Sequence, residues 1–193
     1  PGLMDRPSVQ RETVPNGSPA SANLLNAFDL RLQEDTASPE ALAPIARLMR
    51  AGDLLVVSDW QYERNSLPEP RRLWELVDGA DGLGEPAPFT SDEERRSAVV
   101  DGPPDLAVVP VEGVAPIVST HPGRHPLLVA GDGAGLVDAA EAGLIDGSEL
   151  VRYSATLDDA AVDQALADGA VLLVTDTNRK RGERWNTLRH NRG

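Results

Sequence analysis

The chain has 193 residues, three His, no Cys and a formal net charge of −13, with 40% hydrophobic and 4% aromatic residues. This length suits one domain or two small ones, and the balance of apolar and charged residues excludes a disordered tail and a fibrous repeat. No apolar run reaches the roughly 18 residues that a membrane-spanning helix needs. The absence of Cys excludes disulfides, thiolate zinc sites and a cysteine nucleophile.

The charge is distributed unevenly along the chain. Residues 176–193 carry a net charge of +4, and the remaining residues carry −17. Nucleic-acid binding needs a clustered basic face, so we expect no nucleic-acid partner for the acidic body. The basic end either binds phosphate or pairs with the acidic body of the same chain. The second alternative is the more common one, because short charge runs are usually solvated faces or intramolecular partners.

Two helices and a strand are predicted in the first third of the chain. Ser18-Pro19 is an N-cap followed by proline at the first helical position, and apolar residues at helical spacing predict a helix over residues 19–34. Ser38-Pro39 begins a second helix, which Gly52 is expected to end. The continuous apolar run over residues 53–58 predicts a buried strand.

The middle of the chain has weaker signals. Residues 59–69 are polar with aromatics and are expected to form a loop, and a short helix is expected from Pro70. Residues 79–104 are rich in Gly, Pro and charge and show no period, which indicates irregular structure. Two short apolar runs, residues 106–111 and 115–119, predict a hairpin.

The last third alternates strands with helices. Apolar runs predict strands at 126–130, 150–153 and 171–175, with helices between them, the second one capped by Thr156. Short links in this order require parallel pairing and right-handed crossovers. We therefore predict an α/β layered module with a mostly parallel sheet flanked by helices, in which the strand at 53–58 joins the same or an adjoining sheet.

The same patterns divide the chain into three segments. An N-terminal helical and α/β segment spans residues 1–104, and a strand-helix-strand-helix-strand segment spans residues 105–175. A basic C-terminal linker follows over residues 176–193.

The turn Gly131-Asp132-Gly133-Ala134-Gly135 lies between a predicted strand and a predicted helix, where phosphate-binding turns occur. Its spacing does not match the dinucleotide fingerprint, no P-loop Lys-Ser/Thr follows, and Asp132 would repel a phosphate. The alternative is a tight strand-to-helix turn with Asp132 as the N-cap.

A candidate ligand site follows from the rule that parallel sheets bind ligands at the carboxyl ends of their strands. Acids and amides beside aromatic planes suit sugars or other polar ligands. The candidate residues are Asp59, Trp60, Tyr62, Asp132, Asp176, Asn178 and Arg179. The alternative is that the aromatic residues pack against the first two helices and that Arg179 pairs with Asp176.

The sequence contains no signature of catalysis, metal binding or cofactor binding. His121 and His125 are separated by Pro122-Gly123, which excludes a shared helical face, and no third ligand is near them. No G-x-S-x-G nucleophile motif occurs. We therefore expect no catalytic residue, metal or cofactor in this chain.

A set of short stretches is distributed over most of the chain outside residues 79–104. They are Asp5-Arg6-Pro7, Glu12-Thr13-Val14-Pro15, Gly17-Ser18-Pro19-Ala20-Ser21, Leu24-Leu25-Asn26-Ala27, Gly52-Asp53-Leu54-Leu55-Val56-Val57-Ser58-Asp59, Gly131-Asp132-Gly133 and Val174-Thr175-Asp176-Thr177-Asn178-Arg179. Together they resemble the soluble extracytoplasmic region of the actinobacterial α-(1→3)-arabinofuranosyltransferase family. Members of that family are very large polytopic membrane proteins that build envelope arabinan from a polyprenyl-phosphate arabinose donor.

The resemblance implies a place for this chain in a larger protein. In the family, acidic residues in loops beside the membrane helices resemble the catalytic groups of other lipid-donor glycosyltransferases. No position of this chain matches those loops, so no catalytic role is transferred. The resemblance implies a soluble piece on the extracytoplasmic face that follows the membrane region, with the rest of the parent protein and cell-wall glycan as its partners.

Three functional hypotheses result. The first is a non-catalytic accessory module of an arabinofuranosyltransferase-like membrane protein, which is structural or contacts glycan. The second is a free-standing α/β protein that binds a sugar or another small molecule. The third hypothesis is that the chain is an enzyme in its own right, and the absence of nucleophile, metal and cofactor signatures disfavours it.

Overall fold

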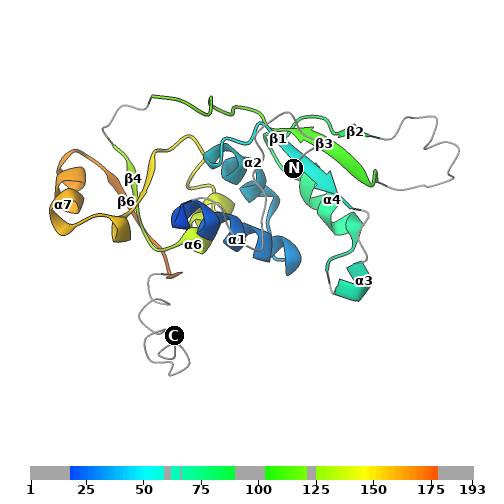
Figure 1. Ribbon diagram of the computed structural model, residues 1–193, viewed down its shortest axis with the longest axis horizontal. Helices are drawn as coiled ribbons and strands as arrows, with labels where there is room; N and C mark the ends of the chain where they lie inside the picture. The colour runs from blue at the N-terminus through cyan, green and yellow to red at the C-terminus, as the bar shows by residue number, and fades with distance from the viewer. Residues whose placement is uncertain (1–17, 59–61, 66, 90–102, 121–124, 178–193) are drawn as a thin grey trace, which may run out of the picture.

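The computed structural model describes residues 18–58, 62–65, 67–89, 103–120 and 125–177. Its helices are α1 (Pro19–Gln33), α2 (Pro39–Leu48), α3 (Tyr62–Asn65), α4 (Pro70–Asp78), α6 (Gly133–Glu141) and α7 (Asp159–Ala167), with a 3-10 turn η1 (Ser154–Thr156). Its strands are β1 (Asp53–Val57), β2 (Ala87–Pro88), β3 (Leu106–Pro110), β4 (Leu127–Ala130), β5 (Val151–Tyr153) and β6 (Val171–Val174). The molecule is elongated, with one small sheet toward each end and α1, α2 and α6 between them (Figure 1).

The first two helices begin at the predicted Ser-Pro pairs. The Oγ of Ser18 caps α1 by accepting a hydrogen bond from the main-chain N–H of Ser21 at 3.2 Å. The predicted end of the second helix at Gly52 is wrong. Helix α2 ends at Leu48, and Arg50 adopts the left-handed conformation after it, with φ of 57°. A nearby glycine is therefore not a sufficient signal for the helix end.

The sheet at one end is antiparallel, with strand order β1-β3-β2. Helices α2 and α4 pack on it through buried side chains that include Leu42 and Trp74. The predicted hairpin strand at 115–119 is wrong, because residues 112–120 form no strand. Two causes explain this result: Pro116 lacks an N–H, and both edges of β3 already pair with β1 and β2.

Three further differences from the sequence predictions are local. Strand β2 lies inside the stretch at 79–104 that was expected to be irregular, and α3 lies inside the loop expected at 59–69. The helix expected to be capped by Thr156 begins later. Its N-cap is Asp158, whose Oδ1 accepts from the main-chain N–H of Ala161 at 2.8 Å.

The sheet at the other end confirms the predicted parallel arrangement. Its order is β5-β4-β6, and both neighbours run parallel to β4. Leu127 is in register with Val151 on one side and with Val171 on the other. Leu128 and Val129 in the central strand are fully buried, as expected for a strand with apolar residues on both faces.

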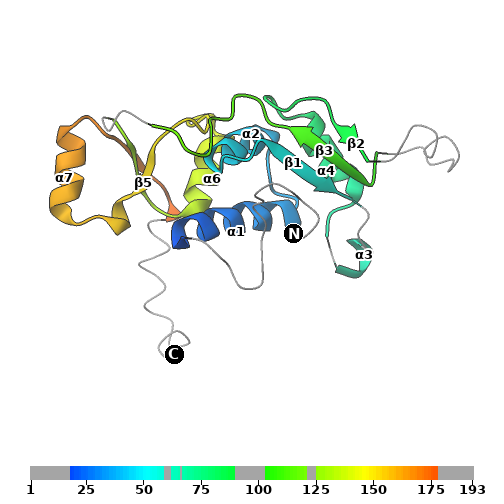
Figure 2. The ribbon, with the colours of Figure 1, turned by 45° about the horizontal axis from the view of Figure 1, so that its top comes forward.

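Helices α1 and α6 pack side by side in the middle of the molecule (Figure 2). Their apolar faces, together with β4 and part of α2, form a core that includes Leu24, Ile45, Leu136 and Val137. Helices flank a parallel sheet, which confirms the predicted α/β class, and the antiparallel sheet is a second sheet toward the other end of the molecule (Figure 1). Strand β3 follows residue 105 but pairs with β1, so the antiparallel sheet draws on both of the first two predicted segments.

Candidate functional site

The turn between β4 and α6 is the first candidate site, because it lies at the carboxyl edge of the parallel sheet. Asp132 is the N-cap of α6, and its Oδ1 accepts hydrogen bonds from the main-chain N–H groups of Ala134 at 3.1 Å and Gly135 at 3.4 Å. The Oδ1 of Asn23, on α1, accepts from the N–H of Gly133 at 2.6 Å. The chain's own oxygen atoms thus occupy the donors that would otherwise face an anion. The predicted N-cap role of Asp132 is confirmed.

The glycines of this turn are explained by close packing. A Cβ on Gly133 would lie 2.5 Å from the Cα of Leu24, because α1 crosses directly over the turn. A Cβ on Gly131 or Gly135 would collide with the side chain of Thr175, just after β6. The Gly-x-Gly-x-Gly pattern therefore lets α1 and the end of β6 approach the turn.

Two threonines join the end of β6 to the same turn. The Oγ1 of Thr177 accepts from the main-chain N–H of Asp132 at 3.1 Å and lies 2.7 Å from the Oγ1 of Thr175. Thr177 is buried, whereas Asp176 between the two threonines is exposed. The structure therefore brings the segments of Asp132 and Asp176 together at this edge.

The structure does not bring Tyr62 to this edge. Tyr62 lies in α3, toward the end of the molecule that holds the antiparallel sheet, whereas α6 lies in the middle, next to the parallel sheet (Figures 1 and 2). The physical reason is that β1 belongs to the antiparallel sheet, so its carboxyl end does not share an edge with β4 and β6. The other candidates, Asp59, Trp60, Asn178 and Arg179, lie outside the described residues.

Sequence reasoning missed Asn23, Thr175 and Thr177 as parts of this edge. The threonines carried a signal, since polar residues at alternate positions directly after an apolar strand indicate side chains that return to the sheet edge. Asn23 carried none, because it is 110 residues from its partner Gly133.

A second concave site is an apolar pocket of about 380 Å³ beside the antiparallel sheet. Its walls come from the second half of α1, from β1 and from α4, and they include Phe28, Leu32, Leu73 and Leu76. This volume is within the range of about 300–1,000 Å³ that is usual for ligand pockets. No sequence pattern indicates this pocket, because its walls are far apart along the chain.

Charged side chains at the rim of this pocket are paired with one another. The Nε of Arg72 on α4 lies 3.1 Å from the Oδ2 of Asp35, which follows α1. The hydrogen bond to Asp35 is also the main cause that raises the pKa of Arg72. Arg31 turns toward α6, where its Nη1 lies 2.8 Å from the Oε2 of Glu141 and it also pairs with Asp138.

Neither concave region contains a group of three or more His, Asp or Glu arranged to hold a metal ion, as far as the described residues extend. Within the same residues, no helix has the length and apolar character needed to cross a bilayer. The fold and these two regions define a two-sheet α/β module whose glycine-rich turn is filled by its own side chains.

Comparison with known proteins gives the family. Residues 2–193 match the family model described as alpha-(1->3)-arabinofuranosyltransferase, N-terminal GT-C domain, and the chain belongs to this family. A GT-C domain is that of a membrane glycosyltransferase, so the family is one of membrane proteins. No curated protein and no solved structure matches the chain.

Proposed function

We propose that this chain is a non-catalytic, extracytoplasmic accessory module of an arabinofuranosyltransferase-like membrane glycosyltransferase, with the rest of that protein as its partner. The observation that supports this function is the occupation of the α6 N-terminus by the side chains of Asp132 and Asn23. A phosphate-linked donor would need to displace the carboxylate of Asp132 from these N–H groups, and the two negative charges would repel each other. The turn is therefore suited to hold α1 in place, which is a structural role.

The proposal extends to contact with cell-wall glycan at the edge formed by Asp132 and Asp176. Sugars present hydroxyl donors, and carboxylate oxygens are strong acceptors for them. The carboxylate of Asp176 is exposed, and Thr175 and Thr177 anchor its main chain on either side. An anchored exposed acceptor orients a hydroxyl group at little cost in conformational entropy.

The catalytic part of the proposal is tested by an activity assay on the isolated chain. The chain is incubated with a polyprenyl-phosphate arabinose donor and an arabinan acceptor, and the product is followed by radiolabel transfer. We expect no transfer above a protein-free control. Turnover by this chain alone would overturn the non-catalytic role.

The glycan contact is tested by titration with arabinan fragments, followed by NMR. We expect the amide signals of Thr175–Thr177 to shift and Asp176→Ala to weaken the binding. Asp163→Ala, at an exposed position on α7, is the matched control and should leave binding unchanged. Shifts confined to other regions, or equal binding by both variants, would contradict contact at this edge.

A further inference from the structure

Strand β1 has one edge that does not pair with β3. It is the outer strand of the order β1-β3-β2. The carbonyl oxygen of Gly52 accepts from the N–H of Val111 at 2.8 Å, and the N–H of Ser58 donates to the carbonyl oxygen of Asp105 at 2.8 Å. In an antiparallel pair, hydrogen-bonded positions alternate, so the main-chain groups of even-numbered β1 residues face β3.

The main-chain groups of the odd-numbered residues Leu55 and Val57 therefore face away from the sheet. No other described residue donates to them or accepts from them. Each residue presents one N–H donor and one carbonyl acceptor, with the spacing of an extended chain. Unpaired groups of this kind form a template for an additional strand.

The apolar pocket runs along this same edge. Four consecutive residues of β1, Leu54 to Val57, line it, which places the edge of the strand in the pocket wall. Phe28 and Leu32 of α1 form one side, and Leu73 and Leu76 of α4 form another. Side chains at alternate positions of an added strand would therefore meet an apolar surface.

Both arginines that line the pocket are in ion pairs. Arg72 is paired with Asp35, and Arg31 is paired with Asp138 and Glu141. An anionic group entering this pocket would therefore lose its hydration without gaining a free cation as its counter-ion. Most of the remaining lining is apolar, and burial of any charge against it is costly, so the pocket favours an uncharged occupant.

We propose that the outer edge of β1, which pairs with no described residue, and its pocket bind an extended, uncharged segment of a partner polypeptide by strand addition. Only an extended peptide main chain offers donors and acceptors at the spacing of Leu55 and Val57. A purely apolar molecule would fill the pocket but would leave these groups without partners. The occupant is thus recognised through its main chain and through apolar side chains at every second position.

The direct test uses the whole chain and the peptide acetyl-Ser-Val-Thr-Val-Thr-Ser-amide, with amide hydrogen exchange measured by NMR. Without peptide, the amides of Leu55 and Val57 should exchange faster than those of Leu54 and Val56, which face β3. With saturating peptide, exchange at Leu55 and Val57 should slow by roughly tenfold or more, while Leu54 and Val56 change little. Binding without added protection at these two amides would overturn strand addition, and so would the absence of binding.

A matched pair of variants tests the edge itself. Leu55→Pro removes the outward N–H and leaves the hydrogen bonds to β3 in place, so it should weaken peptide binding by roughly tenfold. Leu55→Thr retains the N–H and should bind within about twofold of the parent chain. Equal binding by both variants would contradict the proposal.

A modified peptide keeps the test decisive if Leu55→Pro does not fold. The same peptide with its central amides N-methylated retains its apolar side chains but cannot form the ladder. We expect it to bind at least about tenfold more weakly than the unmodified peptide. Equal affinity of the two peptides would overturn the proposal. The proposal would also be overturned if, without peptide, the amides of Leu55 and Val57 became protected as the protein concentration rises, because a second copy of the chain would then occupy the edge.

Discussion

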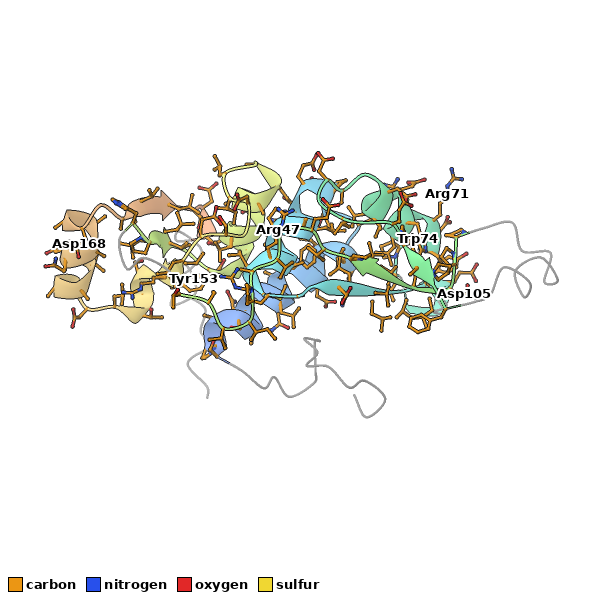
Figure 3. All side chains as sticks on the ribbon, turned by 90° about the horizontal axis from the view of Figure 1, so that it is seen from above. Arg47, Arg71, Trp74, Asp105, Tyr153 and Asp168 are labelled. Carbon is orange, nitrogen blue, oxygen red and sulfur yellow. The ribbon has the colours of Figure 1, made fainter. Side chains whose placement is uncertain are left out.

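The Nε of Arg47 donates a hydrogen bond to the main-chain carbonyl oxygen of Glu112 over 2.7 Å. Its Nη1 also donates to the carbonyl oxygen of Asp146 at 3.1 Å. Glu112 follows β3 of the antiparallel sheet, and Asp146 lies in the loop between α6 and β5 of the parallel sheet. This side chain of α2 therefore joins loops of the two sheets near the middle of the molecule (Figure 3). The φ of Gly147 is 91°, and a Cβ there would lie 2.6 Å from the Cβ of Arg47, so a glycine is needed beside the arginine.

Replacing Arg47 with Met should lower the free energy of unfolding by about 1–2 kcal/mol, because hydrogen bonds from a charged donor are lost while the aliphatic stem is kept. Urea denaturation of the two chains measures this difference. Arg71→Met is the matched control, since the side chain of Arg71 is 81% exposed and pairs only with Glu75 one turn away among the described residues. Its effect should stay within about 0.5 kcal/mol, and equal effects of the two variants would contradict the bridging role.

Gly133→Ala should destabilise the chain by about 1–3 kcal/mol, because the new Cβ would force α1 away from the turn at the start of α6. Gly52→Ala is the control, because nothing lies within 4 Å of a Cβ at that position. It should be neutral or slightly stabilising, since it restricts the unfolded chain. Thermal unfolding compares the two variants, and a loss of stability in Gly52→Ala that matches Gly133→Ala would exclude close packing as the cause.

Ser58→Ala should cost about 1–3 kcal/mol, because the buried hydroxyl joins two groups that would lose their partner. The Nε1 of Trp74 donates to the Oγ of Ser58 at 3.3 Å, and this Oγ donates to the carbonyl oxygen of Pro104 at 2.9 Å. In the Trp74→Phe background, which lacks the indole N–H, Ser58→Ala should cost less. A double-mutant cycle measures the difference, and additive effects would show that the indole contact contributes nothing.

The predictable part of the fold is the part that local signals determine. The parallel sheet follows from three apolar runs separated by capped helices, and the N-cap role of Asp132 follows from its position before a helix. The antiparallel sheet was not predictable in the same way. Strand β2 is only two residues long, and the partners of β3 depend on segments that are distant in sequence.

The candidate site shows the same limit. The segments of Asp132 and Asp176 lie next to each other, because both follow strands of one parallel sheet. The sequence prediction placed Tyr62 with them only on the assumption that β1 joins that edge, and β1 instead belongs to the other sheet. The pocket beside β1 depends on where α1 and α4 lie relative to that strand, and no local pattern specifies their positions.

The acid stability of the loop before β5 should depend on Asp146. Hydrogen bonds from the side chain and then the main chain of Ser148 lower the pKa of Asp146, and the main-chain N–H of Ser148 donates to its Oδ1 at 2.8 Å. The carboxylate of Asp146 therefore binds a proton less readily in the folded state than in the unfolded state. The stabilisation of the fold by this carboxylate is fully present above the pKa of about 3.9 in the unfolded chain, and it is lost as the pH falls through the lower pKa of the folded chain.

Asp146→Asn should flatten this part of the curve of unfolding free energy against pH, measured by urea denaturation between about pH 2 and pH 6. Asp163→Asn, at an exposed position on α7, should leave the slope as it is in the parent chain. An unchanged slope in Asp146→Asn would show that the carboxylate of Asp146 does not contribute to the loss of stability at acid pH.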